Sequence, residues 1–200
     1  MFFVIGLGNP GKRYTGTRHN VGFEVADCLS ARLGVSFKAG RGDFLIAPGN
    51  HSGKPFAIVK PQTFMNESGL ALLDLRKQFD PRLDELLVVC DDFQLPLGQL
   101  RLRARGSDGG HNGLSSAIYH LQSEEFPRLR CGIASTAMPV DKNLMADFVL
   151  DRFRVEESGV LKEMIAQAAD ACLLTLTEGI TKAMNVFNKK LVSDSDSPTQ

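Results

Sequence analysis

The sequence predicts an α/β fold: a single-domain, three-layer α/β/α arrangement with a mixed, largely parallel twisted central sheet. Short apolar runs that are typical of buried strands alternate along the chain with stretches of helical periodicity. Neither an internal repeat nor an interior linker divides the 200 residues, and 43% of them are hydrophobic, which is enough for one sizeable core. We expect this domain to span residues 1–190. Residues 191–200 are mostly polar and are expected to form a disordered tail.

The N-terminal half of the chain predicts three strands and two helices. Phe2–Leu7 is a continuous apolar run, as expected of a strand buried on both faces. Residues 21–33 carry apolar side chains at every fourth position before a glycine, which is typical of a helix and its C-terminal end. Phe44–Ala47 and Pro55–Val59 flank a short polar turn and predict a hairpin. Ser68–Phe79 is expected to be a helix that stops before an Asp-Pro pair.

The C-terminal half continues the alternation. Leu86–Asp91 predicts a second strongly buried strand. Gln99–Arg105 alternates leucine or alanine with arginine, which predicts a strand with one apolar and one cationic face. A glycine-rich loop leads into a helix around Gly113–Leu121, and Leu129–Ala134 predicts another strand. Two further helices are expected at Glu156–Thr177 and Thr181–Asn188.

The formal net charge is zero, with 23 Lys and Arg against 23 Asp and Glu. This balance excludes a protein that coats nucleic acid by its overall charge. The balance is nevertheless a cancellation between segments. Residues 1–60 carry eight basic and three acidic side chains and residues 99–142 carry six and four, whereas the other two segments are net acidic. A local cationic face therefore remains possible.

Cysteine and apolar patterns indicate the compartment. The four cysteines are far apart and form no CxxC pair, which favours reduced thiols in the cytoplasm. The four histidines pair with nothing at ligand spacing, so we expect no metal. The apolar start Met1–Ile5 is too short for a signal peptide, and the longest aliphatic run, Leu86–Cys90, is too short to cross a membrane. We expect a cytoplasmic protein that does not enter a membrane.

Polar residues cluster where four predicted strands end, in the segments Gly8–Asn20, Lys60–Asn66, Asp91–Asp92 and Gly109–Gly113. In open α/β sheets, ligands bind in the crevice beyond the carboxyl ends of the strands. We therefore expect the chemistry there. The groups that these segments supply are one imidazole, three amides and one carboxylate, from His19, Asn9, Asn66, Asn112 and Asp91.

The string GLGNPG after the first strand matches the GxGxxG dinucleotide fingerprint, which would indicate an NAD-dependent enzyme. In that fingerprint the third glycine opens a helix that holds the pyrophosphate. Here Gly11 is followed by a polar stretch without helical period, and the helix begins later. The acidic residue expected further on would be Glu24 or Asp27, and both lie inside that helix. The pattern therefore argues against a nicotinamide site.

A pairing of His19 with Asp91 would make a general base. A carboxylate that accepts a hydrogen bond from an imidazole fixes its tautomer and leaves the other ring nitrogen to activate water. The alternatives are that His19 is a capping or packing histidine and that Asp91 and Asp92 begin a solvated loop or cap a helix. Asn66 and Asn112 have an alternative as helix N-caps. No GxSxG motif is present and no cysteine lies in an electropositive loop, so direct attack by water is favoured.

Several segments carry a family resemblance. The chain resembles bacterial-type peptidyl-tRNA hydrolases in the strings GLGNPGKRYTGTRHNVGF, KPQTFMNESG, VVCDDFQLPLGQLRLR, GSDGGHNGLSS and RLRCGIAS, in that order. The resemblance extends from about residue 2 to residue 188. It implies an esterase that cleaves the bond between an N-substituted aminoacyl or peptidyl group and tRNA, and so frees tRNA from peptidyl-tRNA dropped by or trapped on stalled ribosomes.

The resemblance also implies residue roles. It assigns the catalytic base to His19, its stabilising carboxylate to Asp91, and recognition of an acylated amino group to Asn9. By the same resemblance, Asn66 and Asn112 hold the substrate and position the water. The remaining matched positions are two aromatic substrate contacts and two phosphate contacts, namely Tyr14, Phe64, Arg103 and Arg130, with Lys142 near them in sequence.

The implied partner is the acceptor stem and 3′ end of peptidyl-tRNA. The resemblance further implies a monomer that needs no cofactor or metal and binds neither DNA nor a membrane. The alternative is a non-catalytic RNA-binding relative, similar to organellar members that serve in splicing. The complete set of matched polar positions argues against that alternative, because a protein that only binds RNA does not need a base paired with a carboxylate.

Overall fold

In the computed structural model, residues 1–188 are described. The expected tail at residues 191–200 lies outside this range. A seven-stranded sheet occupies the centre, with the strand order β2-β3-β4-β1-β5-β7-β6. The strands are β1 Phe2–Gly6, β2 Lys38–Ala39, β3 Phe44–His51, β4 Lys54–Pro61, β5 Leu86–Pro96, β6 Leu100–Arg103 and β7 Arg128–Ala134. The helices are α1 Val21–Leu33, α2 Ser68–Phe79, α3 Asn112–Leu121, α4 Met145–Leu150, α5 Ser158–Glu178 and α6 Ile180–Phe187.

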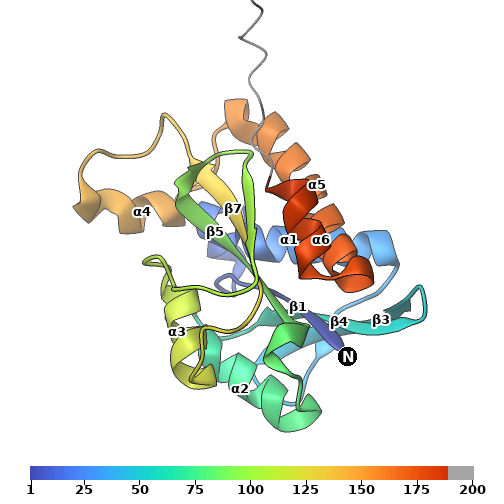
Figure 1. The fold of residues 1–200 in the computed structure, drawn as a ribbon. Coiled ribbons are helices and arrows are strands. Elements are labelled where there is room, and N and C mark those ends of the chain that lie inside the picture. The colour runs from blue at the N-terminus through green and yellow to red at the C-terminus, as the bar shows by residue number, and fades with distance from the viewer. Residues whose placement is uncertain (189–200) are drawn as a thin grey trace, which may run out of the picture.

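The sheet is mixed in the way that the sequence predicts. Its four central strands, β4, β1, β5 and β7, run parallel to one another, whereas β2, β3 and β6 pair antiparallel at the two edges. Helices α1, α5 and α6 pack on one face of the sheet, and α2 and α3 pack on the other (Figure 1). The three-layer α/β/α fold class is therefore confirmed.

Side chains of the central strands alternate between two cores. In β1, Val4 faces the helices α1 and α5, while Phe3 and Ile5 face α2 and α3, and all three are buried. This arrangement explains the uninterrupted apolar run at the start of the chain, because a strand covered on both faces has no side that tolerates polar residues.

Most predicted elements agree with the structure to within a residue or two. Helix α1 ends at Leu33, and Gly34 adopts the left-handed conformation (φ 65°) that closes it. The hairpin strands β3 and β4 are longer than expected and meet at Ser52 and Gly53, which both have positive φ, the conformation that two-residue hairpin turns require.

One expected strand end was wrong, and two short elements were not expected at all. Strand β5 continues past Asp91 to Pro96, because β7 goes on pairing with it through Asp92 and again at Pro96 after an irregularity. Asp91 therefore lies inside a strand. The two-residue strand β2 and the six-residue helix α4 were not expected, since elements this short carry too little periodicity to detect.

The chain reverses its direction of growth at β1. Strand β4 pairs with one side of β1 and β5 pairs with the other, so the crevice at their carboxyl ends is a topological switch point. None of the helices in residues 1–188 has the length and hydropathy needed to span a bilayer.

Candidate active site

Glycine at position 22 decides how His19 meets the sheet. His19 lies in a 3₁₀ turn, Arg18–Asn20, directly before α1. A Cβ atom on Gly22 would lie 2.5 Å from the carbonyl oxygens of both Leu7 and Val89. Only a glycine therefore allows the first turn of α1 to rest on β1 and β5. This close approach brings the imidazole of His19 over β5.

His19 and Asp91 form a buried pair, as the sequence suggested. The Nδ1 atom of His19 lies 2.8 Å from Oδ1 of Asp91, and the two side chains are 10% and 2% exposed. With Nδ1 bound to the carboxylate, Nε2 is the ring nitrogen that remains available to a water or a substrate. The reading of His19 as a mere cap is excluded by this contact, since its ring engages Asp91 and caps nothing.

A second histidine, His111, completes the group. Its Nε2 lies 2.9 Å from the same oxygen, Oδ1 of Asp91, and the side chain is buried. Its Nδ1 accepts the backbone N–H of Leu114 at 3.2 Å, so His111 is the N-cap of α3. Because Nδ1 acts as an acceptor there, the ring proton is on Nε2 and is donated to Asp91. Sequence reasoning missed His111, although it directly precedes Asn112 in the same glycine-rich turn.

Charge and burial act in opposite directions on this group. Burial alone would raise the pKa of Asp91, but His19 and His111 hold it well below its usual range through charge and hydrogen bonds. For His19 the directions are reversed. Burial alone would lower its pKa, but the charge and hydrogen bond of Asp91 outweigh burial and raise the pKa above its ordinary value of 6.5. Asp91 is therefore a carboxylate at neutral pH, and it makes His19 a stronger base.

Asn9 is held in one orientation by three hydrogen bonds. Its backbone N–H donates to Oδ1 of Asn20 at 2.8 Å, and its carbonyl accepts from Nδ2 of Asn20 at 2.9 Å. Its own side-chain Oδ1 accepts the backbone N–H of Met65 at 2.8 Å. The end of the Asn9 side chain left for a ligand is therefore the NH₂ group, which is a donor.

The expected site residues converge on one pocket of about 290 Å³, which we call the His19 pocket. It contains six of the nine residues singled out in the sequence. Its lining residues are Asn9, Tyr14, His19, Phe64, Met65, Asn66, Asn112, Ala146, Val149 and Leu150. A smaller hollow of about 170 Å³ shares His19 and Asn112 and reaches Asp91 and His111. Side chains that are far apart in the sequence thus surround the free nitrogen of His19.

The mouth of the His19 pocket is aromatic and amide-rich. The rings of Tyr14 and Phe64 meet edge to face, with centroids 6.4 Å apart, and Phe64 is 47% exposed. Asn66 and Asn112 are exposed at the same mouth. Neither is an N-cap, because those positions are held by Phe64 and Glu67 before α2 and by His111 before α3. The helix-cap alternative for both asparagines was therefore wrong.

Helix α4 forms the apolar wall of the pocket. Met145, Ala146 and Val149 face the smaller hollow, and Ala146, Val149 and Leu150 face the His19 pocket. The periodicity of the sequence did not mark this helix, since six residues show hardly two turns. The wall keeps His19 at 8% exposure, which strengthens the effect of Asp91 on it.

His19, Asp91 and His111 also satisfy the spacing of a metal site, since their donor atoms lie within 4.8 Å of one another. The histidines are far apart in sequence, so pairwise spacing along the chain could not reveal them. A metal would have to displace the proton that His111 donates to Asp91. The residues present therefore fit a hydrogen-bonded acid–base group and not a metal site.

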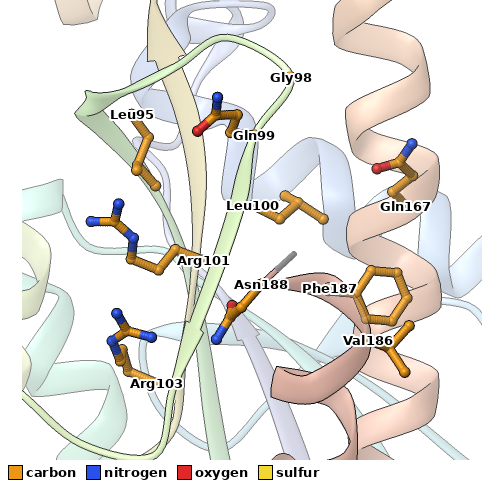
Figure 2. A pocket seen from close by; sticks show the side chains of 10 residues that line it. All are labelled: Leu95, Gly98, Gln99, Leu100, Arg101, Arg103, Gln167, Val186, Phe187 and Asn188. Carbon is orange, nitrogen blue, oxygen red and sulfur yellow. The ribbon is translucent and has the colours of Figure 1, made fainter. Parts of the chain in front are cut away.

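The two arginines expected to contact phosphate lie outside the His19 pocket. Arg103 is exposed on the edge strand β6, where Figure 2 shows it beside Arg101 on one side of the strand, with Leu100 on the other. These side chains line a hollow of about 400 Å³ that also contains Asn188. Asn188 bonds both the N–H and the carbonyl of Leu102, which covers part of this open edge. The side chain of Lys142 lies outside the described part of the structure.

The side chain of Arg130 is less accessible to a ligand than that of Arg103. Its guanidinium is 11% exposed and donates to the carbonyls of Ser107 and Asp108 at 3.0 and 2.9 Å. It also approaches Oδ2 of Asp92 at 3.4 Å. Arg130 therefore braces the glycine-rich loop that leads to His111, in addition to any charge that it offers a ligand.

The chain is similar to known proteins over nearly its whole length. The family model described as peptidyl-tRNA hydrolase matches residues 3–195. A peptidyl-tRNA hydrolase of Chloroflexus aggregans is 48% identical over 94% of this chain and 99% of that protein. One from Chlorobaculum parvum is 45% identical over 94% and 98%. The crystal structure of the Acinetobacter baumannii peptidyl-tRNA hydrolase superposes with a TM-score of 0.86 at 30% identity, covering 92% of this chain and 93% of that one.

Proposed function

Because this chain belongs to the peptidyl-tRNA hydrolase family, a family of hydrolases that act on peptidyl-tRNA, we propose that His19 is the base with which it cleaves the ester. The observation that carries this proposal is the hydrogen bond between Nδ1 of His19 and Asp91 inside the His19 pocket. It leaves one basic nitrogen directed at a space lined by amide groups, which is what attack by water requires.

The proposed reaction needs one water molecule. Nε2 of His19 takes a proton from the water as its oxygen bonds to the ester carbonyl carbon. The bond from that carbon to the 3′-terminal ribose oxygen then breaks, and the imidazolium returns the proton to the ribose oxygen. Asp91 stabilises the imidazolium throughout, and His111 holds Asp91 in place. The products are free tRNA and a peptide or N-acyl amino acid.

Asn9 is proposed to read the acyl group on the amino nitrogen. The NH₂ end of its side chain is the free end, and it donates to the carbonyl oxygen of an N-acyl or peptide group. A free aminoacyl-tRNA lacks that carbonyl and presents an ammonium group, which has donors only. Two donors facing each other repel, so the unblocked substrate is discriminated against.

The remaining roles follow the layout of the pocket. Asn66 and Asn112 are proposed to hold the ester and the attacking water, and Tyr14 and Phe64 to pack against the terminal nucleotide or the acyl chain. Arg103 and Arg130 are proposed to contact phosphates of the acceptor stem, where binding depends on charge and not on base identity. We further propose one domain over residues 1–190, a monomer in the cytoplasm, and no role for DNA.

The decisive experiment compares an N-acetylated aminoacyl-tRNA with its unacetylated counterpart. Wild-type protein is expected to release tRNA from the first and to spare the second, and His19→Ala is expected to abolish release. Equal release from both substrates would disprove the role of Asn9, and a His19→Ala protein that retains most of its rate would disprove the base assignment.

A further inference from the structure

The residue before the proposed base, Arg18, is an unusual buried cation. It is 1% exposed, and its Nη2 donates to both carboxylate oxygens of Glu157 at 2.9 and 3.3 Å. Glu157 is itself 7% exposed and lies in the turn that opens α5. An ion pair with this burial is costly to form and, once formed, is costly to break from one side.

Two aromatic rings enclose the guanidinium. Its central carbon lies 4.6 Å from the ring centroid of Phe148 and 4.7 Å from that of Phe153. Nε and Nη1 of Arg18 are buried without a hydrogen-bond partner among the described residues, so the π faces are their main favourable contact. A planar guanidinium satisfies this arrangement, and a lysine ammonium does not.

These contacts join the turn that contains His19, Arg18–Asn20, to α4. Phe148 belongs to α4, and Phe153 and Glu157 belong to the segment that connects α4 to α5. The backbone makes two further links, from the N–H of Arg18 to the carbonyl of Asp151 at 3.0 Å and through an antiparallel bridge between Thr17 and Arg152. Figure 1 shows α4 at the edge of the molecule, apart from the two helical layers.

We propose that Arg18 and Glu157 are positioning residues that hold α4 as the wall of the His19 pocket. Arg18 directly precedes His19 in the chain. Helix α4 supplies Ala146 and Val149 to both hollows around the imidazole of His19. When the pair is broken, α4 withdraws, water reaches the His19–Asp91 pair, and the reaction slows. The affinity for tRNA is expected to stay the same, because the proposed phosphate contacts Arg103 and Arg130 belong to strands β6 and β7 and not to α4.

This inference rests on the proposed role of His19. Its test first breaks the Arg18–Glu157 pair by substitution and then asks whether a disulfide at the same place restores the rate. Glu157→Gln keeps the shape of the side chain and removes its charge. It is expected to lower kcat about tenfold or more, with KM within about twofold of wild type, because misplacing the wall affects the reacting geometry and not the phosphate contacts. The matched control is Glu156→Gln, because the Glu156 side chain is 71% exposed and its ion pair with Arg154 is long, at 4.0 Å. This variant is expected to keep the wild-type rate.

Cysteines at the bridged positions replace the lost tether. Thr17→Cys and Arg152→Cys, added to Glu157→Gln, place two thiols on directly opposed bridge residues, where a disulfide can form. Oxidation is expected to restore kcat to within about threefold of wild type, and reduction to abolish the gain. The same two cysteines in a protein with Glu157 intact are expected to be active in both states.

Two results would overturn the inference: a folded Glu157→Gln protein with wild-type kcat, or an oxidised triple variant with no recovery. If Glu157→Gln does not fold, Arg18→Lys takes its place in the same oxidised and reduced comparison, with the same two deciding outcomes. The oxidised and reduced forms of one variant are compared by their relative rates. This comparison therefore still tests the role of Arg18 and Glu157 if His19→Ala shows that another group is the base. Failure of the proposed function and failure of this inference are therefore distinguishable.

Discussion

The single carboxylate oxygen Oδ1 of Asp91 lies 2.8 Å from Nδ1 of His19 and 2.9 Å from Nε2 of His111. Two imidazoles thus direct their protons at one acceptor. Because the helix N-cap determines the tautomer of His111, its proton is always available to Asp91, and His19 supplies the second. The result is a fixed anion beside the one ring nitrogen that faces the pocket.

Replacing Asp91 tests this anion. Asp91→Asn keeps an acceptor oxygen but removes the charge, so the imidazolium that forms during attack is no longer stabilised. We expect kcat to fall about 100-fold or more, as for loss of general base assistance, while the fold is retained. Single-turnover release of tRNA from an N-acetylated aminoacyl-tRNA measures this. A rate within a few-fold of wild type would show that the carboxylate is dispensable.

The pH profile tests the direction of the His19 shift. In the proposed reaction only neutral His19 activates water, so kcat/KM should rise with pH, and its midpoint should lie above 6.5 because Asp91 raises the pKa of this residue. In Asp91→Asn the burial of His19 remains and the charge is gone, which moves the midpoint below that of wild type. Initial rates between pH 5 and pH 9 decide this. A midpoint that does not move on substitution would contradict the coupling.

Stability in acid should depend on the same carboxylate. The pKa of Asp91 is lowered in the folded protein against 3.8 for the ordinary residue, so its contribution is fully present above that value and is lost as pH falls below it. Wild type should therefore lose about 1.4 kcal/mol for each pH unit in this range from Asp91 alone. Asp91→Asn should show a shallower decline. Urea unfolding at several pH values from 2 to 5 measures the difference, and parallel curves below pH 3.8 would refute it.

His111→Asn separates the two roles of His111. Asparagine is a good N-cap and should keep the start of α3 intact, but it is too short to replace the hydrogen bond to Asp91. We expect the melting temperature to change by only a few degrees and kcat to fall about tenfold, the value of one charge-assisted hydrogen bond. Circular dichroism and steady-state rates report the two effects. A large loss of stability with an unchanged rate would show that His111 only caps α3.

Arg103 and Arg130, the proposed phosphate contacts, should govern how tRNA binding depends on salt. Each phosphate contact removed lowers the slope of log affinity against log salt by about 1. Arg103→Ala should therefore weaken tRNA binding equally for tRNAs of different sequence and reduce this slope, with kcat unchanged. Binding of deacylated tRNA between 50 and 300 mM salt measures it. The control is Arg82→Ala, an exposed arginine paired with Asp84 and outside β6, which should leave the slope as it is.

The order of strands and helices could be predicted from local patterns. Continuous apolar runs such as Phe2–Leu7 identify strands covered on both faces, and Gly34 marks a helix end whose observed φ is positive. The sequence did not predict the elements that lack such patterns, which are β2, α4 and the continuation of β5 beyond Asp91. Their existence depends on pairing partners and neighbours that a local window does not contain.

The residue types at the strand ends, together with the family resemblance, were sufficient to single out His19, Asp91 and five of the side chains that gather around them. Only the tertiary structure showed that the two residues touch, because their contact depends on the approach of α1 to β1 and β5 at Gly22. The structure alone likewise revealed His111 as the second partner of Asp91, the orientation of the Asn9 amide, and the burial of Arg18 against Glu157. These are relations between atoms distant in sequence, and their energies come from burial and hydrogen-bond geometry, which no single segment of the chain can encode.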